Sequence, residues 1–295
     1  ALSVLAVGAF LLVQFLAAPQ PQLLNLDGST MGTSWNVQLR STANAESLSA
    51  LASEISQLLT VLDKEVFSTY SETSEISRLN QAPVAQAQPL SADMLPVLLA
   101  AVQVYEASEH AFDISVAPLV NLWGFGPAVR DQGIPDPAAI AEAMAMPGMA
   151  ALELNSTEAT LVKRQNVQLD LSGIAKGYAV DRVADFLLSR GETAFLVEIG
   201  GEIRVQGRRA DKQPWTLAIE KPQEGERAVF TTISNHGLPL AVAGSGDYRN
   251  YRIVAGRRYS HEIDPRTGYP VQHQVAAVTV VASTAMLADA WATAL

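Results

Sequence analysis

The chain has 295 residues, no cysteine and a formal net charge of −10, and 48% of its residues are hydrophobic. That length corresponds to one large or two small domains, and so apolar a composition excludes a disordered or collagen-like chain. The acidic balance argues against nucleic acid as a partner, since binding it needs a surplus of cations facing the phosphates. The absence of cysteine excludes disulfides, thiolate zinc sites, iron–sulfur clusters and a cysteine nucleophile.

The sequence opens on an apolar segment, residues 1–18, that carries no charge. Its length lies between the core of a signal peptide and a membrane span, which needs about 20 residues. We therefore expect residues 1–22 to be an export signal or a membrane anchor, followed by one domain at 23–295. Because the final helix has no C-terminal cap, we expect that domain to continue beyond Leu295.

Four helices are predicted in the first two thirds of the sequence. Apolar residues at steps of three and four make the first two amphipathic. The expected helices span 47–62, 91–109, 137–146 and 175–190. Ser91 suits the N-cap of the second helix, and Gly191 suits the position just after the fourth, where a left-handed residue often ends a helix.

Strand signals cluster in the second half. Segments typical of strands lie at 167–169, 194–199, 202–206, 215–220, 229–233, 252–254, 258–263 and 275–282. The dipeptide Ala255-Gly256 joins two of them into a hairpin-like arrangement, and a last helix is expected from Ala285 onwards. Helices in the middle and antiparallel strands afterwards predict the α+β class.

Four polar clusters stand among these apolar elements, whereas the GxxxxGK[ST] and GxGxxG signatures of the usual nucleotide-binding folds are missing. The first cluster, DLSGIAKG at 170–177, lies between a predicted strand and a helix. Such a turn exposes backbone N–H groups that bind anions, and Lys176 could reach the same phosphate. In the alternative reading, Ser172 is an ordinary N-cap and Gly173 serves the turn.

The second and third clusters lie near the predicted hairpin. The second, GSGDYRNYR at 244–252, offers glycines that let a backbone approach a ligand and arginines that can pair with phosphate; a solvated loop is the alternative. The third, SHEIDPRTG at 260–268, contains His261, a candidate general base because imidazole titrates near neutrality. A structural histidine is the alternative there, and Asp264 and Gly268 suit a turn.

The fourth cluster, ADAWAT at 288–293, lies on the final helix. Asp289 and Thr293 are four residues apart and share a helix face. A carboxylate and a hydroxyl are hard oxygen donors, which suit Mg²⁺ completed by carbonyls, water and a substrate phosphate, and which do not suit zinc. The alternative is an Asp–Thr pair on a solvated face.

In their order along the chain, these clusters and several further segments resemble the ApbE family, the FAD:protein FMN transferases. The further segments are MGT at 31–33, which resembles the family's opening strand, FSTY at 67–70, SEISRLN at 74–80, FD at 112–113 and PLVNLWGFG at 118–126. The resemblance runs from about residue 31 to residue 295. It implies an ApbE-like mixed domain related to the T-fold, with antiparallel sheets flanked by helices.

The resemblance also implies an enzyme that uses Mg²⁺ to transfer FMN from FAD to a Thr or Ser hydroxyl of an acceptor protein, releasing AMP. The positions that match FAD contacts are Met31, Ser68, Thr69, Tyr70, Ala111, Phe112, Asp170, Lys176 and Ile263. Asp289 and Thr293 match metal ligands through their side chains, and Gly173 matches one through its backbone carbonyl. His261 matches the group that activates the acceptor hydroxyl.

Two other functions stay open on the sequence. An FAD pyrophosphatase would use the same residues and release FMN and AMP, and a flavin-binding protein would need neither the base nor the metal. The resemblance implies a periplasmic location, a possible inner-membrane anchor in residues 1–22, and an acceptor that is a subunit of a membrane redox complex. Many family members carry a lipid-anchoring cysteine after the leader, and this sequence has none.

Overall fold

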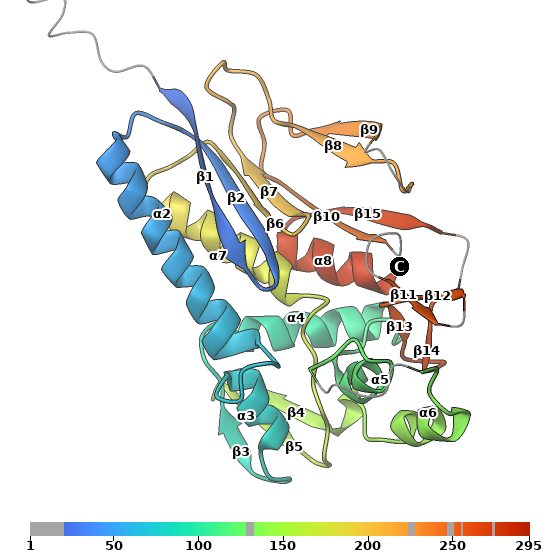
Figure 1. The fold of residues 1–295 in the computed structure, drawn as a ribbon. Coiled ribbons are helices and arrows are strands. Elements are labelled where there is room, and N and C mark those ends of the chain that lie inside the picture. Colours follow the sequence, from blue (N-terminus) through green and yellow to red (C-terminus); the bar gives the residue numbers. More distant parts are fainter. Residues whose placement is uncertain (1–20, 128–132, 224–227, 247–250, 255, 273–274) are drawn as a thin grey trace, which may run out of the picture.

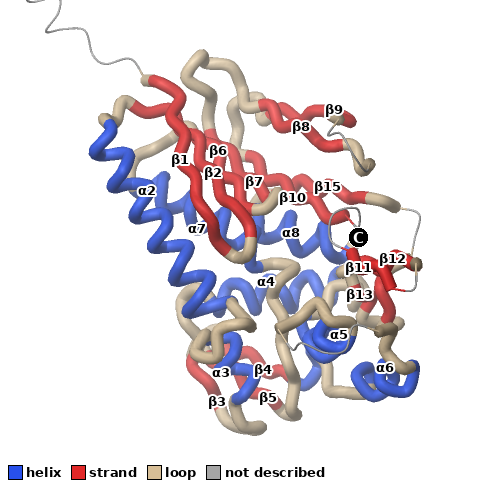
Figure 2. Tube along the Cα trace, in the orientation of Figure 1, coloured by secondary structure: helices blue, strands red, loops and turns tan. Residues whose placement is uncertain are grey.

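The computed structural model describes residues 21–127, 133–223, 228–246, 251–254, 256–272 and 275–295. It confirms the α+β class: a six-stranded antiparallel sheet carries helices on one face, and shorter hairpins and helices lie at one end of the molecule (Figure 1). The tube view separates the helical layer from the strand layer (Figure 2). Among the described residues, no helix is both long and apolar enough to cross a bilayer. Residues 1–20 of the predicted leader lie outside the described part.

Every neighbouring pair of strands in the main sheet is antiparallel. The strand order is β1 (Gln22–Thr30), β2 (Thr33–Ser41), β6 (Phe195–Ile199), β7 (Glu202–Gln206), β10 (Leu240–Gly246) and β15 (Ala277–Ala282). Successive side chains of a strand point to opposite faces, and Trp35, Val37 and Leu39 of β2 are accordingly buried in the core beneath the helices.

Three helices cover one face of this sheet: α2 (Ala45–Thr60), α7 (Ala175–Ser189) and α8 (Ala285–Ala294) (Figure 1). Buried apolar residues of α2 and α7 join the strand residues in one core, among them Ile55, Leu59, Val180, Val183 and Leu187. A fourth helix, α4 (Met94–Ala107), packs against α8. The predicted amphipathic faces therefore form the core of the molecule.

The opposite face of the sheet is covered in part by the two-stranded ribbon of β8 (Thr216–Glu220) and β9 (Val229–Ser234). Trp215 and Leu217 pack there on Val205 and Val242. The remaining elements are α3 (Glu75–Gln81), β3 (Ala87–Pro89), α5 (Ala117–Leu122), α6 (Pro137–Met144), β4 (Leu152–Asn155), β5 (Thr160–Lys163), β11 (Tyr251–Val254), β12 (Arg257–Ser260), β13 (Ile263–Asp264), β14 (Tyr269–Pro270), a π-helical turn at Val61–Phe67 and 3₁₀ turns at Ile114–Val116 and Met149–Ala151.

One of the two predicted caps is confirmed. The N-cap residue of α4 is Asp93 rather than the predicted Ser91, although the Ser91 hydroxyl accepts from the N–H of Met94, the first residue of the helix, at 3.0 Å. Gly191 follows α7 with φ of 83°, in the left-handed region. Helix ends predicted from periodicity agree with the structure to within a few residues for α2, α4 and α7.

The predicted strand at 167–169 is wrong. The backbone of Leu169 pairs instead with the side-chain amide of Asn80, whose Nδ2 donates to the Leu169 carbonyl at 2.9 Å and whose Oδ1 accepts from the Leu169 N–H at 2.7 Å. One amide side chain therefore takes the place of a neighbouring strand.

Three further expectations are corrected. Residues 244–246 are not a loop but the end of β10, paired with β15. Met31 and Gly32 form the turn between β1 and β2 rather than part of a strand, with φ of 46° and 73°. The strand expected at 258–263 ends at Ser260, and Ile263 begins a second hairpin.

The crossing of α7 and α8 predicts a large effect for one small substitution. A Cβ at Gly177 would lie 2.2 Å from the carbonyl oxygen of Ala285, a backbone atom of α8. Gly177→Ala should therefore lower the free energy of unfolding by about 3 kcal/mol, as severe overpacking does. Urea denaturation measures the change.

Gly133→Ala is the matched control, because nothing lies within 4 Å of its Cβ position. That variant should change the free energy of unfolding by no more than about 0.5 kcal/mol. If Gly177→Ala proved as stable as the control, the close approach of the two helices would be refuted.

Candidate active site

The first and fourth polar clusters meet where α7 begins and crosses α8. The N–H of Gly177 donates to Asp289 Oδ2 at 2.9 Å, and Thr293 Oγ1 donates to the carbonyl oxygen of Gly173 at 3.4 Å. Since Asp289 and Thr293 are one turn apart on α8, both face the loop that leads into α7. The structure thus brings together the three residues that the sequence predicted as metal ligands.

The donor set at this crossing fits a hard divalent cation. Asp289 is only 4% exposed, so the alternative of a solvated face is wrong for it. Its Oδ2 is engaged by Gly177, and its Oδ1 lies 3.8 Å from Lys176 Nζ. A carboxylate, a hydroxyl and a carbonyl suit Mg²⁺, which keeps waters or phosphate oxygens in its other positions. The described residues hold no group of three or more His, Cys, Asp or Glu side chains that could bind a metal.

Lys176 lies between two buried acids. Its Nζ is 3.1 Å from Glu202 Oε1, in addition to its approach to Asp289. Burial lowers the pKa of the Lys176 ammonium, but the charges of Asp289 and Glu202 outweigh it, so the pKa lies above its ordinary value. Burial raises the pKa of Asp289. Burial, together with the charge of Asp289, also raises the pKa of Glu202 to about 7.

Glu202 is the member of this cluster that the sequence prediction missed. It was expected only as the first residue of a strand. Its side chain reaches the helical face of the sheet and is 3% exposed, and Oε2 has no hydrogen-bond partner among the described residues. The sequence signal was an acid directly after Gly200-Gly201, at the start of a strand. Burying an oxygen without a hydrogen-bond partner costs free energy, so Oε2 of Glu202 can accept a hydrogen bond from a water or a ligand.

Asp63 links two of the predicted FAD contacts. Its Oδ2 accepts from the N–H of Met31 at 3.2 Å, and its carbonyl oxygen accepts from the N–H of Ser68 at 2.9 Å. The adjacent Phe67 packs edge-on against Tyr178 of α7, with ring centroids 5.7 Å apart. These contacts therefore hold the β1–β2 turn and the start of the 68–70 segment against the first turns of α7.

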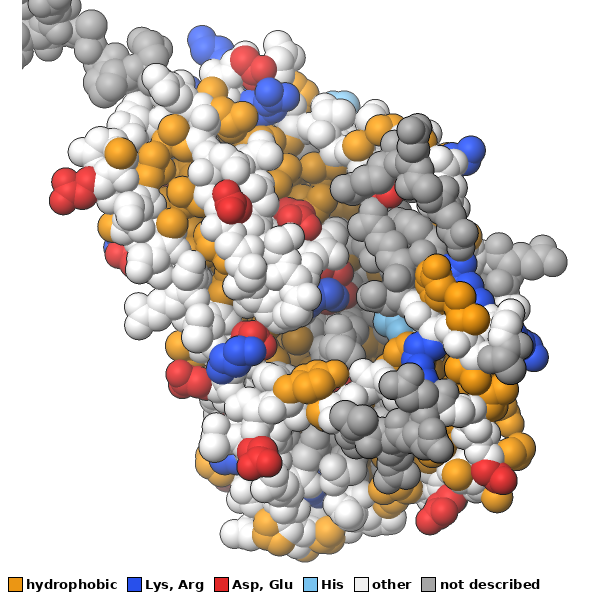
Figure 3. Space-filling view, viewed as in Figure 1, with side chains coloured by type: hydrophobic (Ala, Val, Ile, Leu, Met, Phe, Trp, Pro, Cys, Tyr) orange, Lys and Arg blue, Asp and Glu red, His pale blue; other side chains and the backbone are white. Residues whose placement is uncertain are grey.

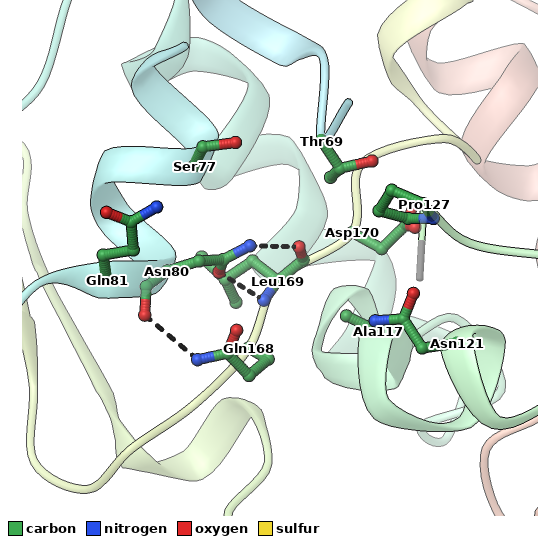
Figure 4. A pocket seen from close by; sticks show the side chains of 10 residues that line it. All are labelled: Thr69, Ser77, Asn80, Gln81, Ala117, Asn121, Pro127, Gln168, Leu169 and Asp170. Atoms are coloured by element: carbon green, nitrogen blue, oxygen red, sulfur yellow. Dashed lines mark hydrogen bonds between the residues drawn. The ribbon is translucent and has the colours of Figure 1, made fainter. Parts of the chain in front are cut away.

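A cavity of about 180 Å³ lies beside that segment and is lined mainly by amides and hydroxyls (Figure 4). Its lining comprises Thr69, Ser77, Asn80, Gln81, Ala117, Asn121, Pro127, Gln168, Leu169 and Asp170. Two of the predicted FAD contacts, Thr69 and Asp170, are among them. Asp170 Oδ1 accepts from both the N–H and the hydroxyl of Ser172. Ser172 therefore does not cap α7, whose N-cap is Ile174, and the N-cap alternative is wrong.

The segment that contains Ala111 and Phe112 runs alongside the same loop. A Cβ at Gly173 would lie 3.3 Å from Phe112 Cε2, and the N–H of Asp170 donates to the carbonyl of Ile114 at 2.7 Å. Tyr70, by contrast, is 71% exposed. Among the predicted contacts, Phe112 and Asp170 are thus buried beside the start of α7, whereas the Tyr70 side chain lies at the surface.

His261 belongs to a separate group of short hairpins that is tied to the sheet. Glu262 accepts from the hydroxyl of Ser245 on β10, and the same strand packs on α8 through Ala243. The ring of Phe125 stands edge-on to the imidazole of His261 with centroids 6.4 Å apart. The histidine segment is therefore connected through β10 to the helix that carries the predicted metal ligands.

Trp123 anchors the same group of hairpins. Its Nε1 donates to the carbonyl of Gly268 at 2.9 Å, and its ring packs with Tyr259 and with Ile263, another predicted FAD contact. In the space-filling view, acidic and basic side chains and a histidine surround a hollow in the middle of one face (Figure 3).

The chain is thus an α+β protein with a site of oxygen donors where two helices cross. Known proteins can be compared with it on that basis. Residues 31–295 match the family model described as the ApbE family. Relatives named FAD:protein FMN transferase are 42% identical in Haemophilus influenzae, over 94% of this chain and 81% of that protein, and 40% identical in Vibrio cholerae, over 98% and 85%.

Solved structures agree with the sequence relatives. The flavin transferase ApbE from Vibrio cholerae matches with a TM-score of 0.83 and 39% identity, covering 93% of this chain and 86% of that one. The apo form of the Pseudomonas stutzeri flavinyl transferase ApbE matches with a TM-score of 0.82 and 37% identity, covering 93% and 84%. The chain therefore belongs to the ApbE family and is an enzyme of the transferase class. The roles of its individual residues stay predictions.

The cluster of Lys176, Glu202 and Asp289 predicts a pH dependence of stability. The pKa of Glu202 in the folded chain, about 7, lies above its ordinary value of 4.5, so folding favours the protonated carboxyl. That contribution is complete below pH 4.5 and is lost as the pH rises through 7. Without divalent cations, the free energy of unfolding of the wild type should fall between pH 5 and pH 8. In Glu202→Gln, which lacks the titrating carboxyl, the fall should be smaller by about 2 kcal/mol.

Urea denaturation at several pH values measures this difference. Glu142→Gln, an exposed change on α6, is the control for the loss of one charge and should keep the wild-type profile. Parallel profiles for the wild type and Glu202→Gln would contradict the prediction.

Proposed function

We propose that this enzyme transfers the FMN moiety of FAD to a Thr or Ser hydroxyl of an acceptor protein, in a Mg²⁺-dependent reaction that releases AMP. The names of its relatives support the flavin transfer. The observation that carries the metal dependence is the convergence of the Gly173 carbonyl, the Thr293 hydroxyl and the Asp289 carboxylate at the α7–α8 crossing.

These three residues would hold the cation. Mg²⁺, when bound, supplies positive charge that offsets the charge of the pyrophosphate oxygens. Lys176 adds a fixed positive charge to the same region, held in place by Glu202 and Asp289. The amide-lined cavity beside Thr69 and Asp170 offers donors and acceptors for a nucleotide.

The chemical step exchanges a phosphoanhydride bond of FAD for a phosphoester bond to the acceptor. The acceptor oxygen forms a bond to the phosphorus on the FMN side, and the bond from that phosphorus to the bridging oxygen breaks, so AMP leaves with the bridging oxygen. A Thr hydroxyl is a weak nucleophile, and a base within hydrogen-bond reach accelerates such a step by about 10² to 10⁴. We assign the proton of the hydroxyl to the imidazole of His261.

The location of the enzyme is part of the proposal. The uncharged segment at residues 1–18 supports export or anchoring. It favours a periplasmic enzyme, with or without an inner-membrane anchor. The acceptor in this proposal is a subunit of a membrane redox complex, as the family resemblance implies.

The proposal is tested by incubating the enzyme with FAD, Mg²⁺ and a candidate acceptor domain, followed by in-gel flavin fluorescence and chromatography of free flavins. Covalent fluorescence on the acceptor that disappears with EDTA or with a Thr→Val or Ser→Ala acceptor is expected. Free FMN without covalent product would instead indicate an FAD pyrophosphatase, and intact FAD would indicate a binding protein. Either result would overturn the proposed transfer.

Asp289→Asn should lower Mg²⁺-dependent transfer by about 10²-fold or more, because it replaces the charged metal ligand with a neutral amide. An asparagine can keep an oxygen acceptor for the N–H of Gly177, so the α7–α8 crossing should survive. Titration calorimetry with Mg²⁺ separates the loss of metal binding from a loss of the helix crossing. Undiminished flavinylation by this variant would refute the assignment of Asp289 as a metal ligand.

His261→Ala should slow transfer by about 10² to 10⁴ while leaving the affinity for FAD within about twofold of the wild type. Fluorescence titration with FAD and the acceptor assay measure the two quantities. His236→Ala, a histidine in the turn before β10, serves as the control and should change neither. Unchanged turnover of His261→Ala would remove its role as the base.

A further inference from the structure

Asp181 of α7 caps the beginning of another helix. Its carboxylate is 7% exposed. Oδ1 accepts from the N–H of Ala285 at 3.0 Å, and Oδ2 accepts from the N–H of Met286 at 2.9 Å. These are the first two residues of α8, whose N–H groups have no partner within their own helix. The hydroxyl of Thr284 accepts from Leu287 N–H at 3.2 Å and completes the cap.

Asp289 does the same for α7, because it accepts from the N–H of Gly177 in the first turn of that helix. Asp181 follows Gly177 by four residues, and Asp289 follows Ala285 by four residues. The two carboxylates therefore cap each other's helix across one crossing. Together with the close contact at Gly177, they fix both the depth and the rotation of α8 against α7.

Apolar contacts and hydrogen bonds both hold α8, a helix of 10 residues, on the rest of the fold. Met286, Leu287 and Trp291 pack on the main core, and on β10 the helix packs through small side chains, with Ala288 and Ala292 against Ala243. Apolar contacts have no preferred direction, whereas the two hydrogen bonds to Asp181 orient the first turn of α8. The bidentate cap by Asp181 therefore helps to set how far Asp289 and Thr293 extend toward Gly173.

We propose that Asp181 is a positioning residue for the metal ligands, an inference that rests on the proposed Mg²⁺ site. It touches neither the metal nor a substrate. It holds the first turn of α8, and α8 in turn carries Asp289 and Thr293 to the carbonyl of Gly173. Burial raises the pKa of the Asp181 carboxyl, and the charge of Arg204, whose Nη1 lies 3.0 Å from Asp181 Oδ1, offsets part of that rise.

Asp181→Asn tests the proposal, because an amide presents only one acceptor and turns an NH₂ group toward the second N–H of α8. We expect the affinity for Mn²⁺, used as a paramagnetic stand-in for Mg²⁺ and measured by electron paramagnetic resonance, to fall at least about tenfold, as for other residues that orient metal ligands. The affinity for FAD without metal should stay within about twofold.

Asp185→Asn is the matched control. Asp185 lies one turn further on the same helix and pairs with the same Arg204 at 3.1 Å, but it is largely exposed and is not among the carboxylates that accept from the α8 N–H groups. This variant makes the same change of charge and should keep wild-type Mn²⁺ affinity. Leu161→Ala, a buried change in β5, controls for loss of stability and should also keep it.

Wild-type Mn²⁺ affinity in Asp181→Asn would overturn the inference. An equal loss in Asp181→Asn and Leu161→Ala would also overturn it, since the effect would then follow stability rather than position. Failure of the proposed transfer gives a different pattern: the wild type would bind Mn²⁺ but leave the acceptor unlabelled, and the contrast between Asp181→Asn and Asp185→Asn would persist.

Discussion

The hydrogen bond from the N–H of Gly177 to the buried carboxylate of Asp289 is the interaction on which the site depends. It forms only because α7 and α8 approach at a residue without a side chain. A buried carboxylate needs hydrogen bonds and a counter-charge to offset its desolvation, and Gly177 and Lys176 provide one of each. Since Oδ2 accepts from the N–H of Gly177, Oδ1 is the oxygen that would bind the proposed cation beside Lys176. One side chain thus serves the packing of two helices and the chemistry of the site.

The charges beside that bond explain why the site would take up a cation. Asp289, Glu202 and Lys176 carry two negative charges and one positive charge in a largely buried cluster. A surplus negative charge away from water is relieved either by a proton or by a metal ion. The pKa of Glu202, raised to about 7, shows the first of these, uptake of a proton. At the proposed metal site, protonation and divalent-cation binding would therefore compete for the same surplus of negative charge.

The sequence predicted the elements and the residues better than it predicted their partners. Apolar spacing located α2 and α4, and the separation of four residues placed Asp289 and Thr293 on one face, because both patterns are local. Nothing local pairs Glu202 with Lys176, which come from different elements 26 residues apart in the printed sequence. The segment around Leu169 looked like a strand because its side chains suit one. Its hydrogen bonds go to a side chain 89 residues away, which no periodicity encodes.

The two halves of the site are built differently, and the difference suits their tasks. Two of the predicted metal ligands, Asp289 and Thr293, lie on α8, and the third, Gly173, lies in the loop just before α7. The two helices cross closely at Gly177, and rigid elements place ligands most reliably. His261 lies among hairpins of two to four residues per strand, which have few backbone hydrogen bonds of their own. Side-chain anchors such as Trp123 to Gly268 and Ser245 to Glu262 hold them instead. In the proposed reaction, the rigid half would fix the small nucleotide and the loosely built half would admit a protein chain beside it. The division therefore suits a reaction between one small substrate and one large one.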